Sequence, residues 1–186
     1  MTIEQDPHLE DLLHAQDHSP PLTGPLTIFN GIVARWCMYL AVVGLLVIVA
    51  IVFYQVIGRR FLHASPTWAE SLALVLILYV TLLAAAVGVR DAGHIGMESL
   101  LVLAPHIWRE RIEFVIHALV LCFGVAMAYN GWILGASVAS YQIPNLPLPE
   151  VVRYIPLVVS GALIVLFSIE HMIALVRGRE VVPTWH

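Results

Sequence analysis

Long apolar runs separated by short polar breaks make up most of the chain. Between Glu70 and Arg90 lie nineteen residues without a charge. As a helix, this run would extend roughly 28 Å, close to the thickness of the hydrocarbon core of a bilayer. Three further runs are long enough to do the same. The sequence therefore predicts four membrane-spanning helices, over about residues 32–57, 67–89, 112–139 and 151–176.

The connections between these runs differ in kind. Residues 58–66 are few enough for a tight hairpin, so the first two helices are predicted to be antiparallel neighbours. Residues 91–111 are too short and too broken by glycine and proline for another span. Helical spacing of their apolar residues predicts a segment lying along the membrane surface. These residues are Met97, Leu100, Leu101, Ala104 and Trp108.

Residues 140–150 connect the last two spans and contain three prolines. Proline cannot continue a helix, and irregular backbone is not stable in contact with lipid. The segment is therefore predicted to be extended and to lie at or above the membrane interface.

The chain divides into a membrane domain and two tails. Residues 1–27 are acidic and lack both the basic start and the apolar core of a secretory signal, so a flexible tail is predicted. Residues 28–180 hold the four spans, and residues 181–186 form a short C-terminal tail. The predicted fold class is an all-α integral membrane protein with four transmembrane helices and a surface segment between the second and third.

Composition supports this fold class and narrows the partners. Apolar residues make up 60% of the chain and charged residues 12%, with a mean hydropathy of +0.86, which is far from a soluble domain. A net charge of -4 without a basic cluster argues against nucleic acid as a partner. Cys37 and Cys122 both fall in apolar runs without a CxxC pair and are interpreted as small packing residues.

Arginine distribution predicts the orientation. With the N-terminus in the cytoplasm, that side collects six arginines and the other side three, as the positive-inside rule favours. The six are Arg35, Arg90, Arg109, Arg111, Arg177 and Arg179, and the three are Arg59, Arg60 and Arg153. Both termini are therefore predicted to be cytoplasmic. The predicted anchors at the bilayer interfaces are Trp36, Arg59, Arg60, Trp108, Arg109 and Trp132, with Trp68 beside them at the outer interface.

Few polar side chains interrupt the spans, although translocation paths and proton relays usually need ionisable groups inside the bilayer. The middle of the first, second and fourth spans has none. Asn130 in the third is interpreted as a hydrogen-bonding link between helices. Gly131 and Gly135 form a small-xxx-small motif that lets another helix approach closely, in this chain or in a partner. The chain alone is poorly equipped to move a polar solute.

Glu70 lies near the outer end of the second span, beside Trp68. Arg59 and Arg60 lie across the predicted hairpin, and an ion pair with one of them would cap it. An acidic residue in a first turn is also favoured by the helix dipole. Docking of a partner is the alternative role for Glu70.

Ionisable residues also mark the inner ends of the spans. Arg90 and His94 follow the second span and are predicted to anchor to lipid phosphate or to touch a partner. Glu170, near the end of the fourth span, is predicted to pair with Arg177 or with Arg111. None of these residues lies in the middle of a span.

Two histidines suggest a second, different function. His117, near the start of the third span, and His171, near the end of the fourth, are predicted to lie at similar depth. Two neutral imidazoles that face each other across a helix bundle can ligate haem iron. The alternative function is therefore the haem-binding membrane anchor of an oxidoreductase. Against it, both sites lie close to the interface, where a histidine needs no special reason.

Three short motifs resemble one known family. Pro66–Ala73 (PTWAESLA) resembles the "s-W-x-E-E-x-a" signature of the small membrane subunit of tripartite ATP-independent periplasmic (TRAP) transporters, the DctQ-type proteins. Gly88–Ile95 (GVRDAGHI) is similar to the "l-r-x-g-x-H-I" stretch of that family. The proline-containing passage before the last span is also similar, through Pro144, Pro147, Pro149 and Pro156. Ser71 departs from the family, which usually has a second acidic residue there.

The resemblance covers about residues 28–180 and implies a division of labour. A periplasmic solute-binding protein captures a solute, typically an organic acid, and a large membrane subunit carries it by a sodium-coupled elevator movement. The small subunit is the non-transporting companion in the bacterial inner membrane, without catalytic activity or cofactor. A free-standing membrane scaffold or chaperone is a further alternative. Candidate partner-interface or structural residues are Trp68, Glu70, Arg90, His94, Gly131, Gly135, Pro147 and Pro149.

Overall fold

Four long helices make up most of the described chain. The computed structural model describes residues 24–61, 66–91 and 106–177. The long helices are α2 (Pro25–Phe61), α3 (Thr67–Asp91), α5 (His106–Ser137) and α6 (Ile155–Val176), and a short 3-10 helix, η1 (Glu150–Arg153), precedes α6. All four contain stretches long and apolar enough to cross a membrane. The predicted all-α membrane fold is confirmed.

Several helices begin or end away from the predicted spans. The first helix begins at Pro25 rather than at residue 32, because proline is well suited to a first helical position. The third begins at His106, so residues 106–111, predicted as the end of the surface segment, are helical and continuous with the third long helix. Residues 92–105, where the rest of that segment is predicted, lie outside the described residues.

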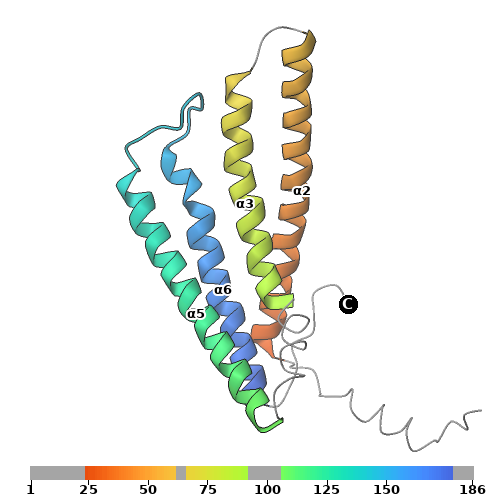
Figure 1. The fold of residues 1–186 in the computed structure, drawn as a ribbon, viewed down its shortest axis with the longest axis vertical. Coiled ribbons are helices and arrows are strands. Elements are labelled where there is room, and N and C mark those ends of the chain that lie inside the picture. Colours follow the sequence, from red (N-terminus) through yellow and green to blue (C-terminus); the bar gives the residue numbers. More distant parts are fainter. Residues whose placement is uncertain (1–23, 62–65, 92–105, 178–186) are drawn as a thin grey trace, which may run out of the picture.

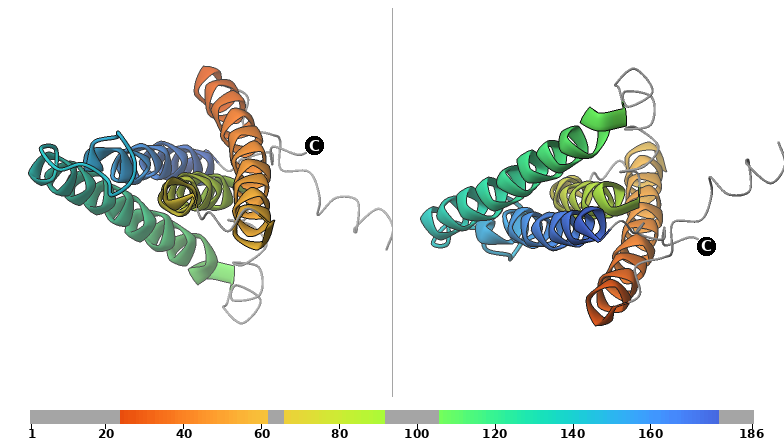
Figure 2. Two further views of the ribbon diagram at one scale, coloured as in Figure 1. Left: turned by 90° about the horizontal axis from the view of Figure 1, so that it is seen from above. Right: turned by 90° about the horizontal axis from the view of Figure 1, so that it is seen from below.

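The helices form two antiparallel hairpins, α2 with α3 and α5 with α6 (Figure 1). Seen from either end, α3 and α6 lie between α2 and α5 (Figure 2). In the most apolar part of each helix, 50% of the residues of α6 are buried but only 6% of those of α2. The fourth helix is thus the centre of the bundle, while α2 presents most of its surface to the surroundings.

An apolar core lies where α2, α3 and α6 meet. Its buried residues are Ala34, Cys37, Ala86, Val87, Leu163, Ile164 and Phe167. Val120 and Met127 of α5 pack against it. Cys37 is a small packing residue of this core, as predicted, whereas Cys122 is exposed on α5 and the same prediction for it is wrong.

Small residues allow α5 and α6 to cross closely. A Cβ atom added at Gly161 would lie 2.7 Å from the backbone nitrogen of Ala128 and 2.8 Å from the carbonyl oxygen of Gly124. A Cβ atom added at Gly131 would lie 3.1 Å from the side chain of Val158 in α6. One added at Gly135 would lie 3.3 Å from the side chains of Val151 and Tyr154, just before α6. The small-xxx-small motif therefore serves contacts within this chain.

The loop between α5 and η1 folds back on itself. The amide of Ile143 donates a hydrogen bond to the carbonyl of Leu148 at 2.9 Å, and Gln142 and Pro149 form an isolated antiparallel bridge. Asn145 reverses the chain with φ of 64°, a conformation that Asn adopts more readily than most residues. The prediction that 140–150 is extended is wrong, because this turn brings two short extended arms together.

Two side chains of α3 hold the loop and η1 in place. The hydroxyl of Ser71 donates to the carbonyl oxygen of Pro144, and the hydroxyl of Tyr79 donates to that of Val152, each at 2.8 Å. Both bonds join residues 73 positions apart. They connect the two hairpins, Ser71 at the end of α3 far from Arg90 and Tyr79 near the middle of that helix.

Replacing Tyr79 with phenylalanine is expected to loosen that connection. The change removes one hydrogen bond and leaves the Val152 carbonyl without its partner, a loss of about 1 kcal/mol. Amide hydrogen exchange should then be faster in residues 141–154, with the other helices little changed. Tyr129→Phe is the matched control, since the Tyr129 side chain is exposed. Equal exchange in both variants would contradict the proposed tie.

Candidate functional site

Most of the buried polar side chains of the described chain lie toward one end of the bundle, here called the Arg90 end. We use the name polar cluster for six of them, each at most 5% exposed: Asn30, Arg90, Asp91, His117, Glu170 and His171. They come from all four long helices. A buried polar group is costly unless it is hydrogen-bonded, so the contacts within the cluster decide what it does.

Glu170 is the centre of the polar cluster and is fully buried. Asn30 Nδ2 donates to its Oε2 at 2.8 Å. Arg90 donates twice to the same carboxylate, from Nε to Oε2 at 3.3 Å and from Nη2 to Oε1 at 3.4 Å. This fork-to-carboxylate geometry fixes orientation as well as distance. One side chain of α6 is thereby bonded to both α2 and α3.

Arg90 has further partners around its guanidinium. Its Nη1 lies 3.3 Å from Oδ1 of Asp91, the next residue, in a second buried ion pair. Its Cζ lies 6.0 Å from the centroid of the Phe167 ring, within the range of a cation–π contact. The last turn of α3 is a favourable place for a cation, because the helix dipole is negative there. Arg90 therefore lies in the last turn of α3, where it meets the carboxylate of Glu170 from α6.

The two histidines connect α5 to the same network. His171 Nε2 donates to the carbonyl oxygen of Arg90 at 2.9 Å. The rings of His117 and His171 are stacked face to face, with centroids 4.6 Å apart and an angle of 6° between their planes. Through this stack α5 contacts α6, which is bonded in turn to α3.

Haem ligation does not fit this arrangement. Two axial histidines must present ring nitrogens to an iron from opposite faces of a porphyrin. Here the rings are stacked with nearly parallel planes and leave no room for a porphyrin between them, and the Nε2 of His171 bonds the carbonyl oxygen of Arg90. The sequence was right that the two residues lie at one depth, but the haem-binding alternative is not favoured.

The structure corrects two predicted partners at this end. Glu170 pairs with Arg90 and Asn30, not with Arg177 or Arg111. Arg90 does not anchor to lipid phosphate, because its side chain is 2% exposed and held by two carboxylates. Both errors have one cause: the contact between α3 and α6 is tertiary and does not follow from position along either helix.

The other predicted site residues are spread over the surface. Glu70 is exposed and, among the described residues, makes no ion pair with Arg59 or Arg60, which are also exposed. Trp68 contacts Tyr54 of α2, with ring centroids 6.3 Å apart. Because the side chains of Trp68, Glu70, Arg59 and Arg60 are exposed, they can contact a partner protein or the bilayer.

Asn130 is not the interhelical link expected from the sequence. It is exposed, and its Nδ2 donates at 2.7 Å to the carbonyl of Ala126 in its own helix. Trp36 and Trp132, two predicted anchors, are 65% and 71% exposed. Pro147 and Pro149 lie in the loop before η1. Trp108 and Arg109 belong to α5, but their side chains, like all of His94, lie outside the described part.

The polar cluster connects helices to one another and has no polar groups exposed for binding a solute. Its charges face one another, its carboxylate accepts three bonds from two helices, and its members are shielded from the surroundings. Asn30 and Asp91 were not singled out from the sequence. The signal that could have found them is the recurrence of polar residues near the same end of every apolar run.

The comparisons with known proteins point to one family. A family model described as "Tripartite ATP-independent periplasmic transporters, DctQ component" matches residues 48–178. The chain belongs to the DctQ family. The matched range includes every member of the polar cluster except Asn30.

Two curated relatives of this DctQ protein agree with that assignment. One, from Haemophilus influenzae, is named a TRAP transporter small permease protein and is 21% identical over 70% of this chain and 81% of its own length. The other is the C4-dicarboxylate TRAP transporter small permease protein DctQ of Vibrio cholerae, 24% identical over 55% of this chain. That match spans 46% of the Vibrio protein. Family membership and four apolar helices make the chain a multi-pass inner-membrane protein.

Proposed function

We propose that this DctQ protein is the small, non-translocating subunit of a TRAP transporter. It supports a large elevator-type membrane subunit during sodium-coupled uptake of an organic acid or similar solute that a periplasmic binding protein delivers. It catalyses no reaction itself, and both of its termini are cytoplasmic. Its partners are the large subunit, the binding protein and the bilayer.

The state of the buried charges carries this proposal. A transport path needs polar or ionisable groups that a passing solute or ion can reach. In the described helices, Arg90 and Glu170 are bonded to each other and almost fully buried. Beyond the polar cluster, the buried side chains of the described helices are apolar apart from the uncharged Ser160 and Ser168. Such an interior supports a fixed companion better than a carrier.

The distribution of ties supports the same role. An elevator mechanism needs one portion that stays in place while another slides. This chain is held at the Arg90 end by the polar cluster and along its length by the close crossing of α5 and α6. Tyr79 adds a bond near the middle of α3, and Ser71 adds one at the far end. Links at both ends make the four helices one stiff body that can extend the fixed portion of a partner.

Asn130 suggests where the large subunit binds. The Tyr79 bond places Val152 beside the middle of α3, and Leu157 and Val158, which contact Gly131, lie further toward the Arg90 end. Asn130 immediately precedes Gly131 in the chain, so it lies at the same depth as the uncharged run of α3. An exposed amide is costly against lipid. A donor from a helix of the large subunit would satisfy its Oδ1.

Asn130→Leu is expected to weaken assembly with the large subunit. One interhelical hydrogen bond in a membrane is worth about 0.6–1.7 kcal/mol, so the affinity should fall about three- to eighteen-fold. The measurement is a binding titration between the two purified subunits in nanodiscs. The control Leu119→Ala changes the same helix without removing a polar group. An affinity unaffected by Asn130→Leu would exclude this face.

Reconstitution tests the proposed function as a whole. Liposomes containing this chain alone, with the binding protein, solute and a sodium gradient, should accumulate no solute. Liposomes that also contain the large subunit should accumulate it and lose that activity when the gradient is collapsed. Accumulation by this chain alone would overturn the proposal.

A further inference from the structure

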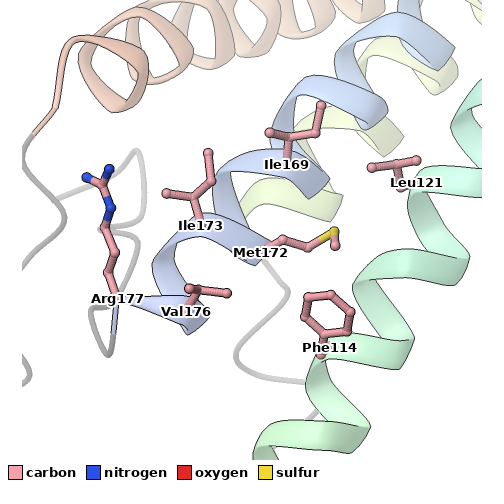
Figure 3. A pocket seen from close by; sticks show the side chains of 7 residues that line it. All are labelled: Phe114, Leu121, Ile169, Met172, Ile173, Val176 and Arg177. Atoms are coloured by element: carbon pink, nitrogen blue, oxygen red, sulfur yellow. The ribbon is translucent and has the colours of Figure 1, made fainter.

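An apolar groove runs between α5 and α6 at the Arg90 end (Figure 3). It has a volume of about 430 Å³. Its walls include Phe114 and Leu121 of α5 and Met172 and Val176 of α6, and Arg177 is its one charged lining residue. No member of the polar cluster lines it, so the groove is a separate feature of the surface.

Arg177 gives the groove a charged end. It follows the last residue of α6, and its amide donates to the carbonyls of Ile173 and Ala174 at 3.1 Å each. Its side chain is exposed and makes no ion pair with any other residue that the structure describes. Leu121 and Arg177 lie at opposite ends of the lining residues (Figure 3). The groove thus passes from purely apolar walls to a single cation.

We infer that this groove binds one glycerophospholipid, with an acyl chain along its apolar walls and the phosphate on Arg177. A guanidinium matches the phosphate group in charge and in hydrogen-bond geometry. The end of a membrane-spanning helix is also the level at which lipid headgroups lie. Met172 has a flexible side chain that adapts to an irregular apolar ligand.

The charge of Arg177 is decisive for this site. The carboxyl end of a helix carries a partial negative charge, which by itself repels phosphate. Binding of a phosphate there requires a cation to offset the helix end. Retention of the lipid should therefore depend on the phosphate and on Arg177 together, and not on the remainder of the headgroup.

Photolabelling tests this site. The full chain, alone and assembled with the large subunit in nanodiscs, is irradiated with phosphatidylglycerol carrying a photoreactive acyl chain. Equal amounts of a phosphatidylethanolamine and a diacylglycerol with the same chain serve as comparisons. Peptides containing Phe114 or Met172 should be labelled several-fold more by both phospholipids than by the diacylglycerol.

Variants separate the two halves of the site. Arg177→Gln should reduce phospholipid labelling to the level of diacylglycerol, and this exposed position can change without disturbing the fold. Met172→Trp should fill the groove and reduce labelling by all three lipids. Arg59→Gln, at the opposite end of the bundle, is the control and should change nothing. Equal labelling by phospholipid and diacylglycerol, or loss of labelling when the large subunit covers the groove, would overturn the inference.

Discussion

Arg90→Met is expected to lower the free energy of unfolding by about 3–5 kcal/mol, the usual cost of removing one partner from a buried ion pair. The substitution leaves the carboxylates of Glu170 and Asp91 buried without their shared cation. It also removes the side-chain ion pair between α3 and α6, while the bond from His171 to the carbonyl oxygen of residue 90 stays possible. Unfolding of the purified chain in detergent, followed by heat or denaturant, measures the loss.

The matched control for this change is Arg153→Met. Arg153 pairs with Glu150 at 3.0 Å, but the two side chains are 28% and 27% exposed, and such pairs contribute less than about 1 kcal/mol. The double variant Arg90→Met/Glu170→Met removes the Arg90–Glu170 pair but leaves the buried Asp91 carboxylate, so it should recover part of the single-variant loss. Similar losses for Arg90→Met and Arg153→Met would contradict the account of the polar cluster.

Gly161→Ala is expected to destabilise the chain by about 1–3 kcal/mol, the range for adding atoms to a tightly packed site. The new Cβ atom would meet backbone atoms of Ala128 and Gly124 at 2.7 and 2.8 Å. Backbone cannot move aside as a flexible side chain can. The helices α5 and α6 must therefore separate locally, which should appear as a lower melting temperature.

Gly88→Ala is the control with the opposite expected sign. Gly88 is also in a long helix, but an added Cβ there has no heavy atom within 4 Å. Alanine is favoured over glycine in a helix by about 0.5–1 kcal/mol, so this variant should be unchanged or slightly more stable. A loss of stability at Gly88 equal to that at Gly161 would show that helix propensity, and not close approach, governs both sites.

The four helices could be predicted from the sequence because the bilayer imposes a length on every crossing. The uncharged run of α3 between Glu70 and Arg90 already has that length. Helix ends were harder, since α2 continues back to Pro25 and α5 back to His106 through residues that no membrane constraint requires to be helical. The turn at Asn145 was missed because proline content alone favours extended backbone.

The polar cluster could be predicted only in part. Sequence position placed His117 and His171 at one depth, and the structure stacks them there. It could not pair Arg90 with Glu170, because these residues are 80 positions apart and meet only through the contact of α3 with α6. Asn30 lay outside the predicted first span, yet it supplies the shortest hydrogen bond to Glu170.

The central claim of this account is that the four helices remain one fixed body while another component moves. Spin labels at positions 46 on α2 and 119 on α5, both exposed leucines, would report the distance across the bundle in a background with Cys37 and Cys122 replaced. The assembled transporter would be measured with and without sodium, solute and binding protein. We expect the distance distribution to stay the same in every state, and a shift of several ångströms (a change on the scale of a rearranging element) would contradict the account.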